Sequence, residues 1–168
     1  ELGGKMRILA IVQARMGSRR FPGKIMADIN GMPLFKIVYK RLKMSKFIDQ
    51  IIFATTNNKK DDEFVLELVR NKISFSRGPE SDVLKRYFDT AKKFSADIIV
   101  RVTCDDPLKC SSVIDYAISR LIEHKFDYCS NTMDPSFPEG LDVECFTFEA
   151  LSKAERYARS PYQREHVT

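Results

Sequence analysis

Short apolar runs alternate with amphipathic segments along most of this chain. The runs 7–13, 50–54, 73–75 and 97–103 have the length and apolar character of buried parallel strands. Apolar residues at helical spacing fill the segments between them, and we expect these helices to begin at Pro33, at Asp61, at Ser81 or Asp82, and at Ser111 or Ser112. This alternation predicts an α/β fold with a mainly parallel central sheet and helices on both faces.

The last part of the chain continues the pattern less regularly. Further strands are predicted at 127–130 and 141–146, and Thr147 is expected to cap a last helix. Asp142 and Glu144 alternate within the second of these strands, so their side chains would share one face. That face either serves a function or, as on an edge strand, points to solvent.

A basic, glycine-containing segment follows the first apolar run directly and reads Gln13-Ala14-Arg15-Met16-Gly17-Ser18-Arg19-Arg20-Phe21-Pro22-Gly23-Lys24. Ligands of α/β proteins usually lie beyond the carboxyl ends of the parallel strands. Glycines let the backbone approach phosphate oxygens, and Arg and Lys neutralise their charge. The segment therefore predicts a nucleoside triphosphate cradle, with a solvated basic loop as the alternative.

This segment is neither a Walker P-loop nor a dinucleotide fingerprint. Five residues separate Gly17 from Gly23, and Ile25 follows Lys24 where a P-loop needs Ser or Thr. A metal would therefore need ligands from elsewhere in the chain. Asp105 and Asp106 follow a predicted strand and offer the oxygen ligands that Mg²⁺ prefers. Alternatively, these two carboxylates only open the turn at the next proline.

Composition places limits on the class of protein. The chain has 168 residues, of which 43% are hydrophobic and 30% charged, as expected of one globular domain. A net charge of +5, spread along the chain, argues against a nucleic-acid partner but allows a small anionic ligand. No apolar run reaches the ~20 residues of a membrane span, and no signal peptide is evident.

Four cysteines and two histidines show no zinc-site spacing, so we expect reduced thiols in a cytoplasmic protein. We interpret residues 1–5 as a non-native remnant and 6–168 as a single domain.

Five motifs, taken in order, resemble those of cytidylyltransferases that activate acidic sugars as CMP-sugars. The similarity is greatest to the SpsF-like branch, named for spore-coat polysaccharide synthesis, alongside acylneuraminate and 3-deoxy-manno-octulosonate cytidylyltransferases. The motifs are 13–24, Arg77-Gly78 with 82–87, Arg101-Val102-Thr103 with Asp105 and Pro107-Leu108, 139–144, and 164–168. The resemblance implies a GT-A-like (Rossmann-like) nucleotidyltransferase fold, and transfer of CMP from CTP to an anionic sugar with Mg²⁺ and release of pyrophosphate.

The resemblance also implies roles for individual residues. Arg15, Lys24 and Asp105 would be catalytic, with Asp105 as metal ligand and Asp106 as a second one. The nucleotide would be bound by Ala14, Arg15, Gly17, Ser18, Arg19, Lys24, Arg77, Gly78 and Asp105. The sugar would be bound by Asp142, Glu144 and His166. The family also implies a homodimer, and the apolar and aromatic residues of 135–168 favour an interface there.

Two features depart from the family pattern. The branch usually has Gly before its metal-site Asp and Cys after it, whereas this chain has Cys104 and Asp106. Family members also continue past the position of Thr168, so the domain is expected to be C-terminally truncated relative to them. Two alternatives therefore stay open: a sugar-nucleotide glycosyltransferase of similar fold, and a nucleotide-binding or assembly module without turnover.

Overall fold

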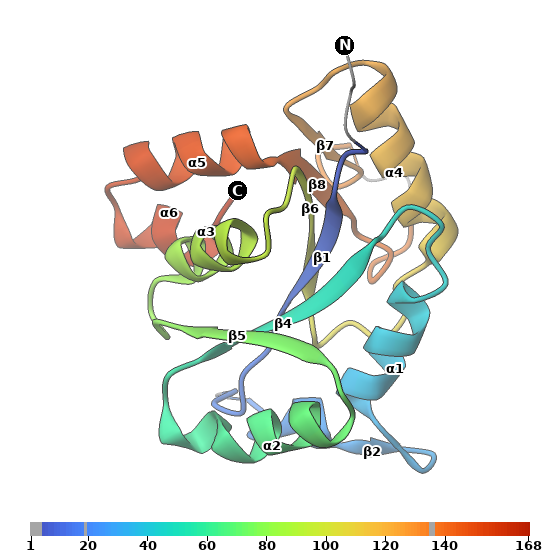
Figure 1. The fold of residues 1–168 in the computed structure, drawn as a ribbon. Helices are drawn as coiled ribbons and strands as arrows, with labels where there is room; N and C mark the ends of the chain where they lie inside the picture. The colour runs from blue at the N-terminus through green and yellow to red at the C-terminus, as the bar shows by residue number, and fades with distance from the viewer. Residues whose placement is uncertain (1–4, 19, 135–136) are drawn as a thin grey trace.

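A computed structural model describes residues 5–18, 20–134 and 137–168. Their central sheet has six strands in the order β5-β4-β1-β6-β8-β7 (Figure 1). The strands are β1 Ile8–Gln13, β4 Gln50–Thr56, β5 Ser74–Gly78, β6 Ile98–Thr103, β7 Tyr128–Ser130 and β8 Glu144–Thr147. Strands β5, β4, β1 and β6 are parallel, and β8 pairs antiparallel with both β6 and β7. The predicted mainly parallel α/β fold is confirmed.

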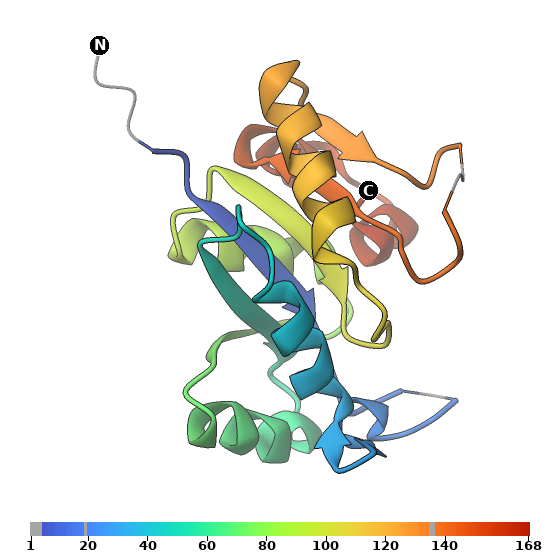
Figure 2. The same ribbon diagram turned by 90° about the vertical axis from the view of Figure 1, so that its right-hand side faces the viewer.

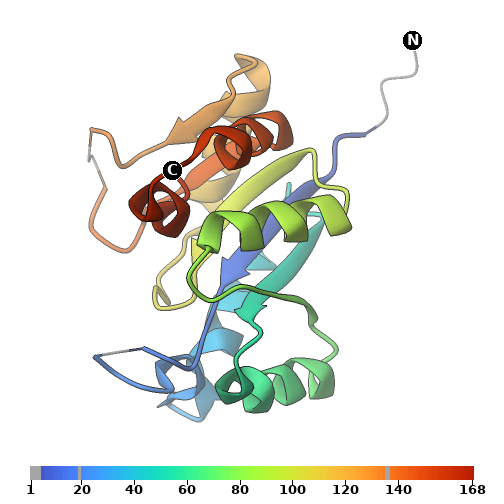
Figure 3. The same ribbon diagram turned by 90° about the vertical axis from the view of Figure 1, so that its left-hand side faces the viewer.

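Helices cover both faces of this sheet. Figure 2 shows α1 (Leu34–Leu42) and α4 (Ser111–Glu123) over one face. Figure 3 shows α3 (Val83–Lys93), α5 (Phe148–Tyr157) and α6 (Pro161–His166) over the other. Helix α2 (Asp62–Arg70) packs its buried residues into the same core as α1 and α4. None of these helices is long and apolar enough to cross a membrane.

Strand β1 is the centre of the molecule because it is buried on both faces. Ile8, Ala10 and Val12 belong to the core under α1, α2 and α4. Leu9 and Ile11 belong to the core under α3 and α5. Alternate residues of a strand point to opposite faces, so a continuous apolar run is what a strand between two helical layers requires.

Several boundaries differ from the predicted ones. Strand β4 continues through two buried threonines to Thr56, and β5 runs to Gly78, so Arg77 and Gly78 are strand residues rather than loop residues. Helix α4 is preceded by Cys110 at the capping position, not by a serine. Strand β8 starts only at Glu144, which leaves Asp142 in the preceding loop.

Some elements were not predicted at all. Helix α6 has a capping box, in which Ser160 and Gln163 satisfy each other's backbone N–H groups, and Pro161 stands at its start. A small hairpin pairs β2 (Asp28–Ile29) with β3 (Met32–Pro33). Two single-turn 3₁₀ helices, η1 (Lys24–Met26) and η2 (Lys59–Asp61), lie next to the loops described below.

An aromatic cluster anchors α2 to the sheet and gives a stability test. The Phe64 ring lies edge-on to Phe35 and Phe53, at 5.3 and 5.8 Å between centroids, and is fully buried. We expect Phe64→Ala to lower the free energy of unfolding by about 3–5 kcal/mol, because it removes buried surface and leaves a cavity. The exposed Val69 of the same helix is the control, and Val69→Ala should change stability by no more than about 0.5 kcal/mol. Equal effects in urea denaturation would contradict this account.

Candidate active site

The carboxyl ends of the four parallel strands meet at one edge of the sheet. Backbone hydrogen bonds continue past the strand ends there: Ala14 N–H donates to Ala54 O (3.2 Å) and Cys104 N–H donates to Gln13 O (3.1 Å). Asn57 N–H likewise donates to Gly78 O at 2.9 Å. The loops after β1, β4, β5 and β6 are therefore fixed side by side, as predicted for the first, third and fourth of them.

The loop after β1 is folded back on itself. The N–H groups of Ser18 and Gly23 both donate to Met16 O at 2.9 Å. Gly23 has a φ of 72°, which an L side chain rarely adopts, so this turn requires glycine. Ile25 is buried and anchors the far end of the loop. Arg19, predicted to bind nucleotide, lies outside the described residues.

A buried carboxylate supports this loop from below. Asp61, only 1% exposed, accepts a hydrogen bond from Met16 N–H at 2.7 Å and another from the Thr56 hydroxyl. A carboxylate is rarely buried unless its oxygens are satisfied. Here the Met16 bond holds the loop after β1 to the loop after β4, and the Thr56 bond fixes Asp61 within the latter. From the sequence pattern, Asp61 is predicted only as the start of a helix.

Lys24 and Asp105 join the basic loop to the carboxylate loop after β6. Lys24 Nζ lies 2.7 Å from Asp105 Oδ2. Burial raises the pKa of Asp105, but the hydrogen bond and charge of Lys24 outweigh it and hold that pKa below its usual range. Asp105 is therefore ionised at neutral pH, and it was brought to Lys24 from 81 positions away in the chain.

Arg15, on the same loop as Lys24, pairs with a different carboxylate, Glu80. Its guanidinium lies 3.4 Å from Glu80, and both side chains are about half exposed. Glu80 also accepts a hydrogen bond from the Asn58 side-chain amide at 3.1 Å. Glu80 was not singled out from the sequence, because a lone carboxylate in a loop carries no pattern. Gly17 lies close to the same residue, since a Cβ built on it would be 3.5 Å from Glu80 Oε1.

Arg77 and Gly78 are engaged in the structure itself. The Arg77 guanidinium donates to the carbonyl oxygens of Thr56 and Asn58 at 2.8 and 2.9 Å, and pairs with Asp62 at 2.7 Å. A Cβ on Gly78 would be only 3.0 Å from the side chain of Arg86. The first residue thus fixes the connection from β4 to α2, and the second makes room for Arg86.

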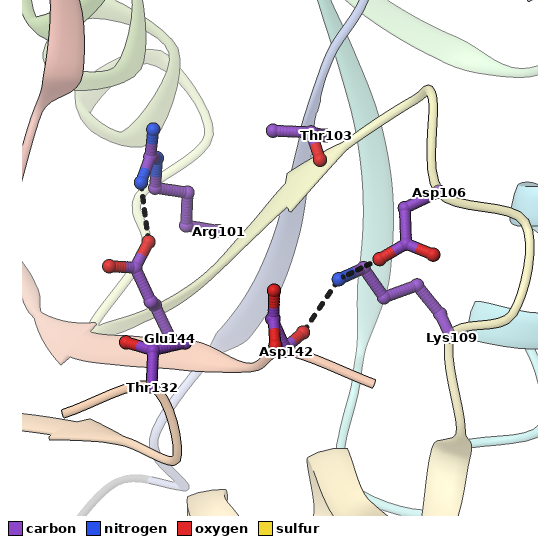
Figure 4. Close-up of a pocket in the computed structure, with 7 residues that line it drawn as sticks. All are labelled: Arg101, Thr103, Asp106, Lys109, Thr132, Asp142 and Glu144. Atoms are coloured by element: carbon purple, nitrogen blue, oxygen red, sulfur yellow. Dashed lines mark hydrogen bonds and ion pairs between the residues drawn. The ribbon is translucent and has the colours of Figure 1, made fainter. Parts of the chain in front are cut away.

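A polar pocket of about 220 Å³ opens beside Thr103 at the end of β6 (Figure 4). It is lined by Arg101, Thr103, Asp106, Lys109, Thr132, Asp142 and Glu144. Two of the three residues predicted to bind sugar, Asp142 and Glu144, therefore line one pocket although they do not share a strand. The third, His166, is exposed on α6 with its ring 4.3 Å from that of Tyr162, and it is not among the lining residues.

Two cation–carboxylate pairs fix the walls of this pocket. Lys109, 5% exposed, lies 2.7 Å from Asp106 and donates to Asp142 O at 2.6 Å. Arg101 pairs with Glu144 at 2.5 Å. The hydrogen bond from Lys109 to the backbone carbonyl of Asp142 ties the loop after β6 to the loop before β8 and so positions Asp142. The Arg101–Glu144 pair joins β6 to β8.

Glu144 is the most strongly engaged carboxylate of the pocket. Besides Arg101, it accepts hydrogen bonds from the hydroxyls of Tyr128 and Thr168, both at 2.8 Å. Burial raises the pKa of Glu144, but the charge of Arg101 and these hydrogen bonds bring it below its usual range. Burial, with the nearby Glu144 charge, raises the pKa of Tyr128 to about 12. Both groups therefore hold fixed protonation states near neutral pH.

Cys104 does not crowd the basic loop. Its side chain is 2% exposed and packs in the core formed with α1 and α4. Burial raises the pKa of its thiol, which keeps it protonated. All four cysteines are free thiols, as expected.

The donor set at this edge suits a magnesium ion only together with phosphate oxygens. Asp105 and Asp106 are held by different lysines, Lys24 and Lys109. Among the residues that the structure describes, no group of three or more His, Cys, Asp or Glu side chains is placed to hold a metal. Mg²⁺ in nucleotide enzymes commonly uses one or two carboxylates and completes its shell with waters and substrate phosphates. A single carboxylate such as Asp105, completed by phosphate oxygens and waters, would meet that requirement.

The Lys24–Asp105 pair predicts a pH effect with a defined sign. Because the folded pKa of Asp105 is lowered, the pair stabilises the fold above the ordinary Asp pKa, and this stabilisation is lost as pH falls through the folded pKa. In Lys24→Met, burial is opposed only by the weaker hydrogen bonds of the Asp105 backbone and the Thr103 side chain, so we expect the pKa of Asp105 to be higher than in the wild type. Carboxyl ¹³C NMR titration measures it, and an unchanged pKa in the variant would contradict the pairing.

Comparison with known sequences agrees with this geometry. A family model described as cytidylyltransferase matches residues 9–168. The chain is 42% identical over 164 residues to an uncharacterized protein of Methanocaldococcus jannaschii (97% of this chain, 66% of the relative). It is 38% identical over 120 residues to a 3-deoxy-manno-octulosonate cytidylyltransferase of Geobacter metallireducens (70% and 45%) and 30% identical over 166 residues to the spore coat polysaccharide biosynthesis protein SpsF of Bacillus subtilis (96% and 68%). The chain thus spans between about half and two thirds of these relatives.

Comparison with solved structures gives the same assignment. A cytidylyltransferase from Leptospira borgpetersenii superposes with a TM-score of 0.91 at 35% identity, covering 96% of this chain and 69% of that one. A CMP:2-keto-3-deoxy-manno-octonic acid synthetase complexed with CTP shares the fold, with a TM-score of 0.73 at 16% identity over 95% of this chain and 82% of that one. The predicted nucleotidyltransferase fold is confirmed. The chain belongs to the cytidylyltransferase family.

Proposed function

We propose that this domain transfers CMP from CTP to a sugar hydroxyl and releases pyrophosphate. The observation that carries the proposal is the cluster of Arg15, Lys24 and Asp105 beyond the carboxyl ends of β1 and β6, beside a polar pocket. Two cations and a carboxylate at that edge form a site for a triphosphate with its metal. Membership of the cytidylyltransferase family identifies CTP as the expected nucleotide.

The reaction needs positioning and charge stabilisation more than covalent catalysis. The sugar oxygen attacks the α-phosphorus in line, and the bond from that phosphorus to the pyrophosphate oxygen breaks. Lys24 would exchange Asp105 for phosphate oxygens, whereas Arg15 meets Glu80 through one guanidinium nitrogen and would turn its other N–H groups to phosphate. Both cations would stabilise the charge that develops on the leaving pyrophosphate. Ala14, Gly17 and Ser18 lie on the same loop. Because the N–H groups of Ala14 and Ser18 already donate to Ala54 O and Met16 O, Gly17 is the one of the three that would offer its backbone N–H to the nucleotide.

A magnesium ion would be held by Asp105 together with phosphate oxygens. When bound, it would neutralise part of the triphosphate charge. Asp106 lines the neighbouring pocket, whereas Asp105 does not, so we assign Asp106 to the pocket and Asp105 to the metal.

We assign the sugar to the pocket lined by Asp142 and Glu144. Carboxylates and threonine hydroxyls bind sugar hydroxyls well, and the pocket supplies both kinds of group. Arg101 and Lys109 are the cations that an anionic sugar would meet there.

Loss of Lys24 should remove nucleotide binding without unfolding the protein. Lys24→Met is expected to abolish the increase in melting temperature that CTP and Mg²⁺ produce, because a phosphate contact is lost. The matched control is Lys153→Met on the surface of α5, which should keep the full CTP response. If CTP and Mg²⁺ raised the melting temperature of Lys24→Met as much as that of the wild type, the basic loop would not be the triphosphate site.

Asp105 and Asp106 should differ in their effect on metal dependence. Asp105→Asn keeps the shape of the side chain but removes its charge, so CTP binding should no longer respond to Mg²⁺. Asp106→Asn should retain most of that response. Isothermal titration with CTP, with and without Mg²⁺, measures both, and the reverse order of effects would show that the ligand is Asp106.

We also propose that the protein forms a homodimer through the segment 135–168. Phe146 is buried in the monomer, but Phe137, Tyr157 and Tyr162 are exposed by 42%, 64% and 71% of their surface. Exposed aromatic residues in one region favour an interface. Light scattering at micromolar concentration should give twice the monomer mass of 19.4 kDa. A clean monomer in the presence of CTP and Mg²⁺ would exclude this dimer.

A further inference from the structure

A buried arginine lies under the loop that follows β5. Arg86 of α3 is only 2% exposed and is among the largest fully buried side chains of the molecule. One guanidinium nitrogen donates to the carbonyl oxygens of Pro79 and Glu80, at 2.6 and 3.4 Å. Its Nε is buried without a hydrogen-bond partner among the residues that the structure describes. Arginine is rarely buried to this extent unless it is paired.

The charge of Arg86 has no direct counter-ion. Within the described ranges, no carboxylate oxygen lies within 4.0 Å of its guanidinium, although twelve other pairs do meet that distance. Burial lowers the pKa of Arg86, as does the nearby Arg15 charge, while Tyr87, Asp61 and Glu80 act in the opposite direction. A charge left in this state costs stability, so its retention calls for a role.

Arg86 holds the Pro79–Glu80 loop from inside. Its side-chain carbons pass so close to Gly78 that a Cβ there would be 3.0 Å from Arg86 Cγ. The guanidinium then reaches the two carbonyl oxygens of the loop. This contact accounts for the glycine at the end of β5, a position predicted to bind the nucleotide.

The same loop carries the partner of Arg15. Glu80 accepts hydrogen bonds from the Arg15 guanidinium at 3.4 Å and from Asn58 at 3.1 Å. The path from α3 to the basic loop is therefore continuous: Arg86 fixes the backbone of Glu80, and the Glu80 carboxylate meets Arg15.

We infer that Arg86 is a positioning residue for nucleotide binding, which acts on Arg15 through the Glu80 loop. This inference rests on the proposed function, because it requires that Arg15 bind the triphosphate. Because Arg86 is only 2% exposed, it would act without contacting the phosphates itself. Its buried, unpaired charge adds positive potential under a site built for an anion.

A double-mutant cycle on CTP binding tests the inference. Isothermal titration with CTP and Mg²⁺ is carried out on the wild type, Arg86→Met, Arg15→Ala and the double variant. We expect Arg86→Met to weaken binding roughly tenfold, and to weaken it by less than about threefold when Arg15 is already Ala, because residues that act through one another are not additive. An equal loss in both backgrounds would mean a general structural effect and would overturn the inference.

Two further variants guard against loss of folding. Leu121→Ala is the control: Leu121 is buried in α4, outside the Glu80 loop, so this change lowers stability but should leave CTP affinity unchanged. If Arg86→Met does not fold, Arg86→Lys keeps the charge but not the planar fork and should weaken binding by about threefold or more. Unchanged affinity in whichever Arg86 variant folds overturns the inference alone, whereas a wild type that binds no CTP overturns the proposed function as well.

Discussion

The whole site depends on the parallel pairing of β1 with β4 on one side and β6 on the other. The carboxyl ends of parallel strands lie at the same edge of the sheet. The short loops that carry Arg15 and Asp105 therefore begin next to each other. Because β1 is buried on both faces, a shift of one residue in its register would exchange its two apolar faces and move every loop at that edge. The geometry of the cradle is thus set by the hydrophobic core.

Below the surface of this edge, charged groups are used as structural supports. Asp61 accepts the N–H of Met16, and Arg86 donates to the carbonyl oxygens of Pro79 and Glu80. One buried charge therefore fixes the loop after β1 and the other the loop after β5. Burying a charge is costly, and the cost is offset here only where the charge completes hydrogen bonds of backbone groups. Such supports keep a polar, exposed loop in one conformation.

The pocket beside the cradle is organised by the same principle. Lys109 and Arg101 each pair with a carboxylate. The Arg101–Glu144 pair and the hydrogen bond from Lys109 to Asp142 O join segments that are distant in the chain. In this polar cavity Glu144 keeps its charge, because its pairing lowers its pKa against the effect of burial, and its neighbour Tyr128 keeps its proton, because burial raises the pKa of that hydroxyl. A sugar-binding site needs such fixed donors and acceptors, since its specificity comes from the orientation of hydroxyl groups.

The sequence pattern predicts the layers, the parallel sheet and the basic loop after β1, because apolar periodicity and turn glycines are local signals. It also predicts the correct edge of the sheet for Asp105, because that residue follows a strand. It missed Glu80, Asp61 and Arg86, and it placed Asp142 in a strand that starts two residues later. These features depend on tertiary contacts between residues that are distant in the chain. Arg15 meets Glu80 across 65 positions and Lys24 meets Asp105 across 81, and no local pattern records which buried charge will face which loop.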